Sequence, residues 1–273
     1  MRKRFGQNFL VNAAAREKLF DALDLKAGDT VWEIGPGLGA MTKGLLERGA
    51  RLTAFEVDPG FCKILRELFP VDINFSLIEG DAFQTWPPEN NHLGTTLPLF
   101  MGNLPYNIGA AMLADFMEKD RLFSRMVVTV QKETAERMAA KPGTSDYSSF
   151  SVLCSSLYRV KTLMTLKSSS FYPAPRVESR GVLLELLPPG ERVTEEPFRQ
   201  LVRSLFSSRR KTIKNNLINF VSSAIVKGSG DAAKTAEEAL ALSGISGSRR
   251  AETLSVFDFS ELSAALRRIG YEQ

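Results

Sequence analysis

The sequence has few of the residue types that build metal centres and disulfide frameworks. Its 273 residues include 2 cysteines and 1 histidine, and Cys62, Cys154 and His92 lie far apart in the chain. Zinc sites and disulfide frameworks need several cysteine or histidine residues at regular spacings. We therefore expect no metal site, two thiols kept reduced in the cytoplasm, and a surface-loop position without chemistry for His92.

Long apolar runs are also missing. No segment approaches the roughly 20 apolar residues that a membrane-spanning helix needs, and the chain has no internal repeat or low-complexity stretch. The basic segment Met1–Phe5 resembles the start of a signal peptide, but Gly6-Gln7-Asn8 interrupts the apolar segment that should follow. The pattern predicts a cytoplasmic protein that does not enter a membrane.

What the sequence does contain is a regular alternation of short β-rich runs and amphipathic stretches. The expected strands are residues 30–34, 51–57, 74–78, 97–101, 126–131, 162–166 and 181–187. The expected helices between them are residues 13–25, 40–47, 59–69, 108–119, 132–140 and 147–158. This alternation predicts a parallel sheet covered on both faces. The last two strands have no helix between them, which predicts an antiparallel pair at one edge.

The segment Pro188-Pro189-Gly190 ends this pattern and indicates a domain boundary. Beyond it the apolar spacing is helical at residues 198–206, 213–226, 232–242 and 259–269. We expect residues 1–188 to form an α/β domain, Rossmann-like and with a mostly parallel seven-stranded sheet. Residues 189–273 should form a small all-helical domain.

Positive charge gathers at the start of this helical part. Arg199 to Lys214 contains six basic residues and no acidic one, which favours a polyanionic partner. A solvated helix face would explain the same charge. A single helix would bring most of these side chains to one face, whereas a break at Ser207-Ser208 would disperse them, and the sequence leaves both arrangements open.

A glycine-rich turn follows the first expected strand, with Gly35, Gly37 and Gly39 after the acidic residue Glu33. The Gly-Lys-Ser/Thr of a P-loop is absent, and the spacing differs from the Gly-x-Gly-x-x-Gly that turns a helix N-terminus toward a pyrophosphate. An acidic residue before the turn suits a cofactor with a cationic amino acid end. The segment therefore favours S-adenosylmethionine, and a turn that binds nothing is the alternative.

Carboxylates follow the next two expected strands. Glu56 comes 19 residues after Gly37, where a carboxylate can accept hydrogen bonds from both ribose hydroxyls. Asp58 is better suited to cap the following helix. Asp81 and Ala82 follow the third strand, where a carboxylate could accept a hydrogen bond from an adenine amine or simply cap a turn.

The fourth strand runs into Asn103-Leu104-Pro105-Tyr106. The exocyclic amine of adenine is a poor nucleophile because its lone pair is delocalised into the ring. The side-chain carbonyl of Asn103 and the main-chain carbonyl of Leu104, which Pro105 can hold toward the cleft, could accept both N–H bonds and direct the lone pair at a methyl group. Tyr106 offers a flat face for the base, worth roughly 1–3 kcal/mol. Catalysis would then rest on positioning and electrostatics; an ordinary Asn-x-Pro turn is the alternative.

Phe171 begins a loop, Phe171–Val177, that its prolines stiffen. An aromatic side chain here could close over a flipped base from the side opposite Tyr106. Packing of Phe171 into the sheet edge is the competing interpretation.

Together these motifs resemble the ribosomal RNA adenine N6-dimethyltransferase family, and within it the small-subunit (16S) branch. The resemblance covers essentially the whole chain through residues 5–10, 33–39, 56, 80–82, 103–106, 130–133, 171–177, 209–212 and 250–255. Val11-Asn12 and Ser148–Ser151 depart from the family pattern.

The resemblance implies that Asn8 and Leu10 contact the cofactor, together with Gly35, Glu56, Asp81 and Asn103. It implies successive methylation of two adjacent adenosines near the 3′ end of 16S rRNA, within an immature 30S subunit and by a monomer. Arg209, Arg210, Lys211 and Lys214 would bind the RNA. Two alternatives stay open: a 23S rRNA adenine methyltransferase of the macrolide-resistance type, and a catalytically silent ribosome-assembly factor.

Overall fold

The computed structural model describes residues 8–70, 73–85, 96–225 and 231–270, and His92 lies outside them. Contacts divide the chain into two compact units. The first is Met1–Ala135 with Arg159–Leu186, and the second is Glu136–Tyr158 with Leu187–Gln273. The second unit thus resumes beside the expected boundary at residue 188. It also includes residues 136–158, which we had placed with the α/β part.

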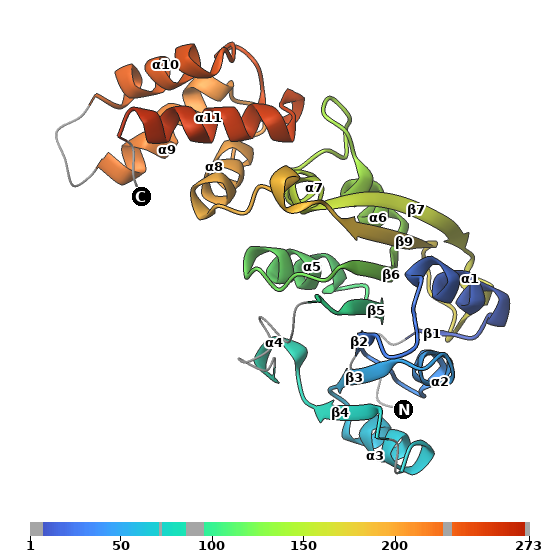
Figure 1. The fold of residues 1–273 in the computed structure, drawn as a ribbon. Coiled ribbons are helices and arrows are strands. Elements are labelled where there is room, and N and C mark those ends of the chain that lie inside the picture. The colour runs from blue at the N-terminus through green and yellow to red at the C-terminus, as the bar shows by residue number, and fades with distance from the viewer. Residues whose placement is uncertain (1–7, 71–72, 86–95, 226–230, 271–273) are drawn as a thin grey trace. The chain divides into compact units, whose positions relative to one another are not determined.

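A mostly parallel seven-stranded sheet forms the centre of the first unit (Figure 1), in the strand order β4-β3-β2-β5-β6-β9-β7. The strands are β2 (Thr30–Ile34), β3 (Arg51–Glu56), β4 (Phe75–Glu79), β5 (Leu99–Asn103), β6 (Arg125–Gln131), β7 (Tyr158–Leu166) and β9 (Ser179–Leu186). The ladders from β4 to β6 are parallel, and β9 runs antiparallel to β6. The expected α/β fold class is confirmed, and each expected strand is present within a few residues of its predicted bounds.

The two faces of the sheet pack different side chains because residues alternate along a strand. On one face, aliphatic residues such as Leu99 and Met101 form a core with side chains of α1 (Ala13–Leu23) and α2 (Ala40–Glu47). On the other, Phe100 contacts Phe116 of α5 (Gly109–Glu118), with ring centroids 5.8 Å apart. The first unit also contains α3 (Pro59–Leu68) and α4 (Ala82–Thr85). The helix α6 (Lys132–Ala139) begins in the first unit and ends in the second.

The second unit is helical around its own apolar core. Its helices are α7 (Ser149–Leu157), α8 (Glu196–Phe206), α9 (Ile213–Ile225), α10 (Ala232–Ser243) and α11 (Val256–Arg268), with 3-10 turns at Pro189–Glu191 and Ala251–Thr253. Fully buried side chains of α8, α9 and α11, such as Leu201, Leu217 and Leu262, share this core with Tyr147. No described helix has both the length and the apolar character to span a membrane.

The basic segment from Arg199 to Lys214 is not one helix. α8 ends at Phe206 and α9 begins at Ile213, so the arrangement with a break is the one that the structure has. Arg199 is only 6% exposed, and its guanidinium donates to the carbonyl of Thr194 (Nε to O, 3.0 Å). Arg199 therefore does not belong to a basic surface.

A two-stranded ladder was not expected from the sequence. β1 (Phe9–Leu10) pairs antiparallel with β8 (Phe171–Tyr172), which a 3-10 turn at Ser168–Ser170 precedes. Two residues are too few for an alternating pattern to stand out, and the partners are far apart in the sequence. The ladder fixes the N-terminal segment beside the loop that contains Phe171.

Candidate active site

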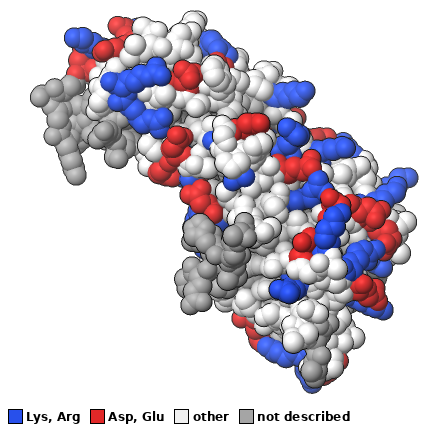
Figure 2. Space-filling view, in the orientation of Figure 1, with Lys and Arg blue, Asp and Glu red and all other residues white. Residues whose placement is uncertain are grey.

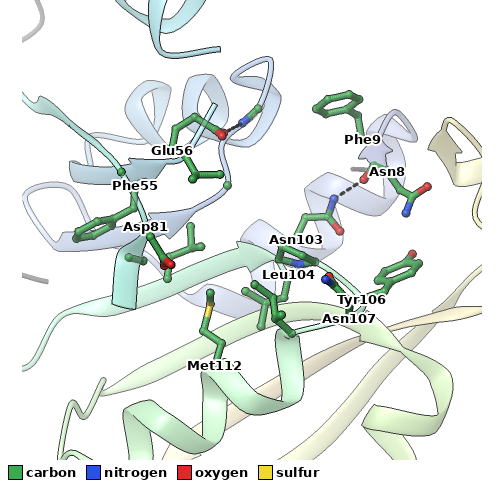
Figure 3. Close-up of a pocket in the computed structure, with 18 residues that line it drawn as sticks. Asn8, Phe9, Phe55, Glu56, Asp81, Asn103, Leu104, Tyr106, Asn107 and Met112 are labelled. Atoms are coloured by element: carbon green, nitrogen blue, oxygen red, sulfur yellow. Dashed lines mark hydrogen bonds between the residues drawn. The ribbon is translucent and has the colours of Figure 1, made fainter. Parts of the chain in front are cut away.

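A cavity of about 260 Å³ lies where β2, β3, β4 and β5 end (Figure 3). Parallel strands bring their carboxyl ends to one edge of a sheet, which is where such folds bind their ligands. The expected residues that line it are Asn8, Gly35, Gly37, Glu56, Asp81, Ala82, Asn103, Leu104, Pro105 and Tyr106. Phe9, Ile34, Phe55, Val57, Gly80, Asn107, Ile108 and Met112 line it as well and were not foreseen.

The glycine-rich turn forms one wall of the cavity. Gly35 and Gly37 have φ angles of 68° and 56°, which L side chains rarely adopt. A Cβ on Gly37 would also stand 2.5 Å from Cε1 of Phe9. Glycine at this position lets the Phe9 ring lie directly over the turn.

Glu56 is tied to the turn through its carboxylate. The N–H of Gly37 donates to Oε2 (3.0 Å) and the N–H of Asp58 donates to Oε1 (2.9 Å). Burial raises the pKa of Glu56, and these hydrogen bonds oppose that effect. Each oxygen keeps a further lone pair, so the carboxylate can still accept from ligand hydroxyls. Asp58 caps α3 as expected, because its Oδ1 accepts from the N–H of Gly60 (2.7 Å).

Glu33, the acidic residue before the turn, does not line the cavity. It is 2% exposed, and the hydroxyl of Thr42 in α2 donates to its Oε2 (2.7 Å). Burial raises the pKa of Glu33 to about 8, and the nearby Glu56 carboxylate contributes to the rise. Glu33 thus anchors the first turn of α2 from outside the cavity.

Asp81 combines the two roles that the sequence left open. Its Oδ1 accepts from the N–H of Phe83 (3.0 Å) at the start of α4, as a cap does. The side chain also lines the cavity, across from Asn103 in Figure 3. One carboxylate oxygen holds the turn, and the other can accept from an amine.

The Asn103 carboxamide is held from both sides. Its Nδ2 donates to the main-chain carbonyl of Asn8 (2.6 Å), and the hydroxyl of Thr129 donates to its Oδ1. The N–H of Leu104 donates to the carbonyl of Thr129 (3.1 Å), and the Pro105 carbonyl accepts from Gly109 at the start of α5 (2.8 Å). Within the described part of the chain, no hydrogen bond is made to the Leu104 carbonyl. The Asn103 and Leu104 oxygens can therefore both accept from a ligand.

Tyr106 lines the cavity, and its hydroxyl is hydrogen-bonded to the hydroxyl of Ser179 on β9. Burial raises the pKa of Tyr106, while the bond to Ser179 opposes the rise. The contact fixes the end of the ring and leaves its face beside the cavity.

Leu10 and Phe171 do not line the cavity. They are 4% and 3% exposed, they face each other in the β1–β8 ladder, and both belong to the aliphatic core under α1 and α2. Packing at the sheet edge, the alternative interpretation of Phe171, is the arrangement that the structure has. The aromatic ring beside Asn8 at the cavity is Phe9, since alternation along β1 turns it away from the core that holds Leu10.

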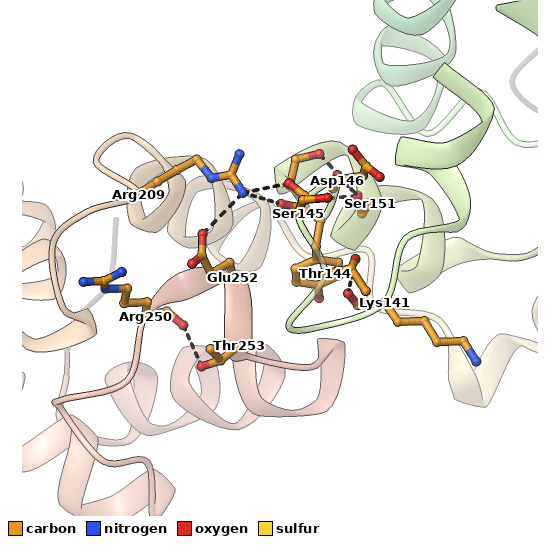
Figure 4. A network of polar contacts seen from close by, with 11 residues as sticks. Lys141, Thr144, Ser145, Asp146, Ser151, Arg209, Arg250, Glu252 and Thr253 are labelled. Carbon is orange, nitrogen blue, oxygen red and sulfur yellow. Dashed lines mark hydrogen bonds and ion pairs between the residues drawn. The ribbon is translucent and has the colours of Figure 1, made fainter. Parts of the chain in front are cut away.

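The expected RNA-binding residues fall into two groups. Arg209 is engaged within the second unit (Figure 4): its guanidinium donates to the carbonyl of Ser145 (3.1 Å) and pairs with Glu252 (3.3 Å). Lys214 pairs with Glu237 (2.6 Å). Arg210 and Lys211 are exposed and have no side-chain partner among the described residues. On the face in Figure 2, Lys and Arg side chains are interspersed with acidic ones.

Sequence reasoning also missed Thr129 and Ser179, which do not line the cavity but contact residues that do. Both are buried, at 2% and 0% exposure, and each hydroxyl contacts a side chain of the cavity. For Thr129, the sequence does contain a signal, which is a single hydroxyl within the apolar run Met126–Val130. A buried hydroxyl needs a hydrogen-bond partner. Among the described residues, no cluster of three or more His, Cys, Asp or Glu could hold a metal ion.

Comparison with known proteins agrees with this geometry. The sequence profile described as ribosomal RNA adenine dimethylase matches residues 1–260. The ribosomal RNA small subunit methyltransferase A of Treponema denticola is 46% identical over 96% of this chain and 88% of its own length. The protein of that name from Treponema pallidum is 41% identical over 98% of this chain and 92% of its own.

Solved structures show the same architecture. A dimethyladenosine transferase from Plasmodium falciparum has a TM-score of 0.81 and 25% identity, covering 96% of this chain and 98% of that one. The 23S rRNA methyltransferase ErmE shares the fold, with a TM-score of 0.68 and 22% identity over 95% of this chain and 100% of that one. The chain belongs to the ribosomal RNA adenine dimethylase family.

Proposed function

We propose that this chain transfers methyl groups from S-adenosylmethionine to the N6 amines of two adjacent adenosines near the 3′ end of 16S rRNA. The relatives that are 41–46% identical are named small-subunit methyltransferases, which favours 16S over 23S rRNA. The observation that carries the proposal is the placement of Asn103 and Leu104 at the cavity that Glu56, Asp81 and the glycine-rich turn surround.

The residues of the cavity fit S-adenosylmethionine. Glu56, at the end of β3, can accept from the ribose hydroxyls, and Asp81, at the end of β4, can accept from the adenine amine. Apolar side chains of Phe55, Val57 and Met112 line the same cavity and suit the faces of a purine. Gly35 and Gly37 have positive φ angles and no side chains. The amino acid end of S-adenosylmethionine can therefore lie directly on the main chain of this turn.

S-adenosylmethionine carries a methyl group on a cationic sulfur and supplies this methyl group to an attacking nitrogen. The sulfur keeps the electron pair of the C–S bond that breaks. The chain's part is to prepare the nitrogen. Asn103 Oδ1 and the Leu104 carbonyl accept the N–H bonds of N6 and turn its lone pair toward the methyl group, while Tyr106 stacks on the base. The methylated nitrogen is cationic and acidic, so it releases a proton to solvent without a strong base.

The second unit would provide the grip on RNA. Arg210 and Lys211, exposed and unpaired among the described residues, are the side chains best placed to meet phosphates. Arg209 and Lys214 are engaged in ion pairs with glutamates. They would bind RNA only if a phosphate replaced the glutamate or contacted the cation together with it. We further propose that the substrate is 16S rRNA within an immature 30S subunit and that the chain acts as a monomer in the cytoplasm.

Asn103→Ala tests the acceptor role. We expect the variant to lose at least about 100-fold in the rate of methyl transfer, because a hydrogen bond that positions the nucleophile is removed at the reacting centre. The assay measures methyl incorporation into immature small subunits that lack the modification, with the methylated adenosines identified by mass spectrometry.

Asn219→Ala, an exposed substitution on α9, is the matched control and should leave the rate unchanged. Full activity in Asn103→Ala would exclude the acceptor role. If the wild-type chain itself gave no incorporation, the catalytically silent assembly factor would be the correct alternative.

A further inference from the structure

Thr129 is the one hydroxyl in the described central part of β6, whose neighbours Val127, Val128 and Val130 are apolar and buried. It lies directly opposite Asn103 in the parallel β5–β6 ladder, so the two side chains share a face of the sheet. A threonine here gives up packing that valine would supply. Its hydroxyl therefore needs an explanation beyond the core.

The main-chain carbonyl of Asn8 and the hydroxyl of Thr129 together hold the Asn103 carboxamide in one orientation. The carbonyl of Asn8 can only accept, so the group that faces it must be Nδ2, and Oδ1 must then face Thr129, whose hydroxyl donates. Rotating the carboxamide by half a turn would set two carbonyl oxygens against each other. The two contacts thus agree on a single orientation.

The two restraints differ in rigidity. Asn8 directly precedes the two-residue strand β1, whereas Thr129 stands in a strand with a neighbour on each side, opposite Asn103 of β5 and Gly181 of β9. The main chain of Thr129 also holds Leu104, whose N–H donates to its carbonyl (3.1 Å). One residue of the central sheet, Thr129, therefore makes hydrogen bonds to both residues that are expected to accept from the amine, Asn103 and Leu104.

We propose that Thr129 is a positioning residue for methyl transfer: its hydroxyl holds the Asn103 carboxamide so that Oδ1 faces the amine of the target base. This inference rests on the acceptor role proposed for Asn103. Thr129 itself touches neither the base nor the cofactor, since it does not line the cavity. Its contribution is to keep the acceptor in the reactive orientation before the substrate arrives.

Thr129→Val and Thr129→Ser separate the hydroxyl from the packing. Valine keeps the volume and removes the donor, whereas serine keeps the donor and removes a methyl group. We expect Thr129→Val to lower kcat for methyl transfer to immature small subunits about tenfold or more, with a smaller change in the affinity for S-adenosylmethionine. Thr129→Ser should recover most of the wild-type kcat.

A purely structural role predicts the reverse order, because serine leaves a cavity in the core and valine does not. Equal losses in both variants, or a Thr129→Val enzyme with wild-type kcat, would overturn the proposal.

Thr53→Val, on β3 of the same sheet and away from the cavity, is the control for a threonine lost from a strand. If Asn103→Ala is inactive while Thr129→Val is unaffected, only the positioning role fails. If Asn103→Ala is fully active, the acceptor role fails first.

Discussion

At the scale of single residues, the site depends on polar groups that the core encloses. Glu33 and Glu56 are both 2% exposed, yet they have different tasks. Glu56 lines the cavity and binds the glycine-rich turn through the N–H of Gly37. Glu33 lies behind that turn and holds Thr42. Because burial raises the pKa of Glu33 to about 8, this side chain places little negative charge beside Glu56 at neutral pH.

Glu33 should make the stability of the fold depend on pH. Burial raises its pKa to about 8 from an ordinary value of 4.5, and unfolding restores the ordinary value. Between about pH 4.5 and about pH 8 the folded chain therefore keeps a proton that the unfolded chain has lost. The free energy of unfolding consequently falls as the pH rises through this window.

Glu33→Gln should flatten this dependence. Glutamine keeps an oxygen for the Thr42 hydroxyl and cannot ionise, so the variant should lose less stability than the wild type on going from about pH 5 to about pH 8. Urea unfolding at several pH values measures the difference. Glu56, whose pKa is also raised by burial, is present in both proteins, so its own dependence largely cancels. Parallel pH profiles of the two proteins would show that Glu33 is ionised in the fold.

At the scale of elements, the start of a helix was predicted where a capping residue was identified, whereas apolar spacing alone placed the start of α11 at residue 259 instead of Val256. Asp58 before Pro59 was expected to cap α3, and it does. Ser255 caps α11 in the same local way: its Oγ accepts from the N–H of Asp258 (3.1 Å), and the N–H of Ser255 donates to Asp258 Oδ2 (2.8 Å). Such caps are readable because donor and acceptor are only a few residues apart.

Ser255→Ala should lower the free energy of unfolding of the helical unit by about 0.5–2 kcal/mol, since the substitution leaves an N–H at the start of α11 without its partner. Urea unfolding followed by circular dichroism measures the change. Ser222→Ala, an exposed serine on α9, should alter stability by less than about 0.5 kcal/mol. An equal effect of both substitutions would mean that the cap contributes nothing.

The β1–β8 ladder shows the limit of local patterns at this scale. Its strands are two residues long and pair Phe9 with Tyr172 and Leu10 with Phe171. Nothing near Phe171 in the sequence shows whether its ring points to the core or to the cavity. The ladder decides this, because its register sends Leu10 and Phe171 into the core and leaves Phe9 at the cavity.

At the scale of the whole molecule, the basic segment divides into structural and accessible charges. Arg209 joins the loop at Ser145 to the segment that contains Glu252, while Arg210 and Lys211 are exposed without side-chain partners among the described residues. A high count of positive charges does not by itself identify the residues that meet RNA.

Arg210→Ala should weaken binding to immature small subunits and lower the slope of log K against log salt by about 1, as expected when one phosphate contact is lost. Its melting temperature should stay close to that of the wild type. Arg209→Ala should lower the melting temperature, because it removes the ion pair with Glu252 and the hydrogen bond to Ser145. Binding isotherms at several salt concentrations, together with thermal unfolding, measure both effects. An unchanged slope in Arg210→Ala would place this residue outside the RNA contact.

The sequence by itself determined the order of strands and helices, the edge of the sheet at which ligands bind, and most of the residues around the cavity. These features follow from local periodicity and from motifs at strand ends, where a parallel sheet necessarily brings side chains together. Only the tertiary structure decided the orientation of Asn103, because Asn8 and Thr129 stand 95 and 26 residues away from it. It likewise placed Leu10 and Phe171 in the core and gave Arg209 a structural contact. Hydrogen bonds and packing between residues so far apart in the chain leave no periodic trace in the sequence.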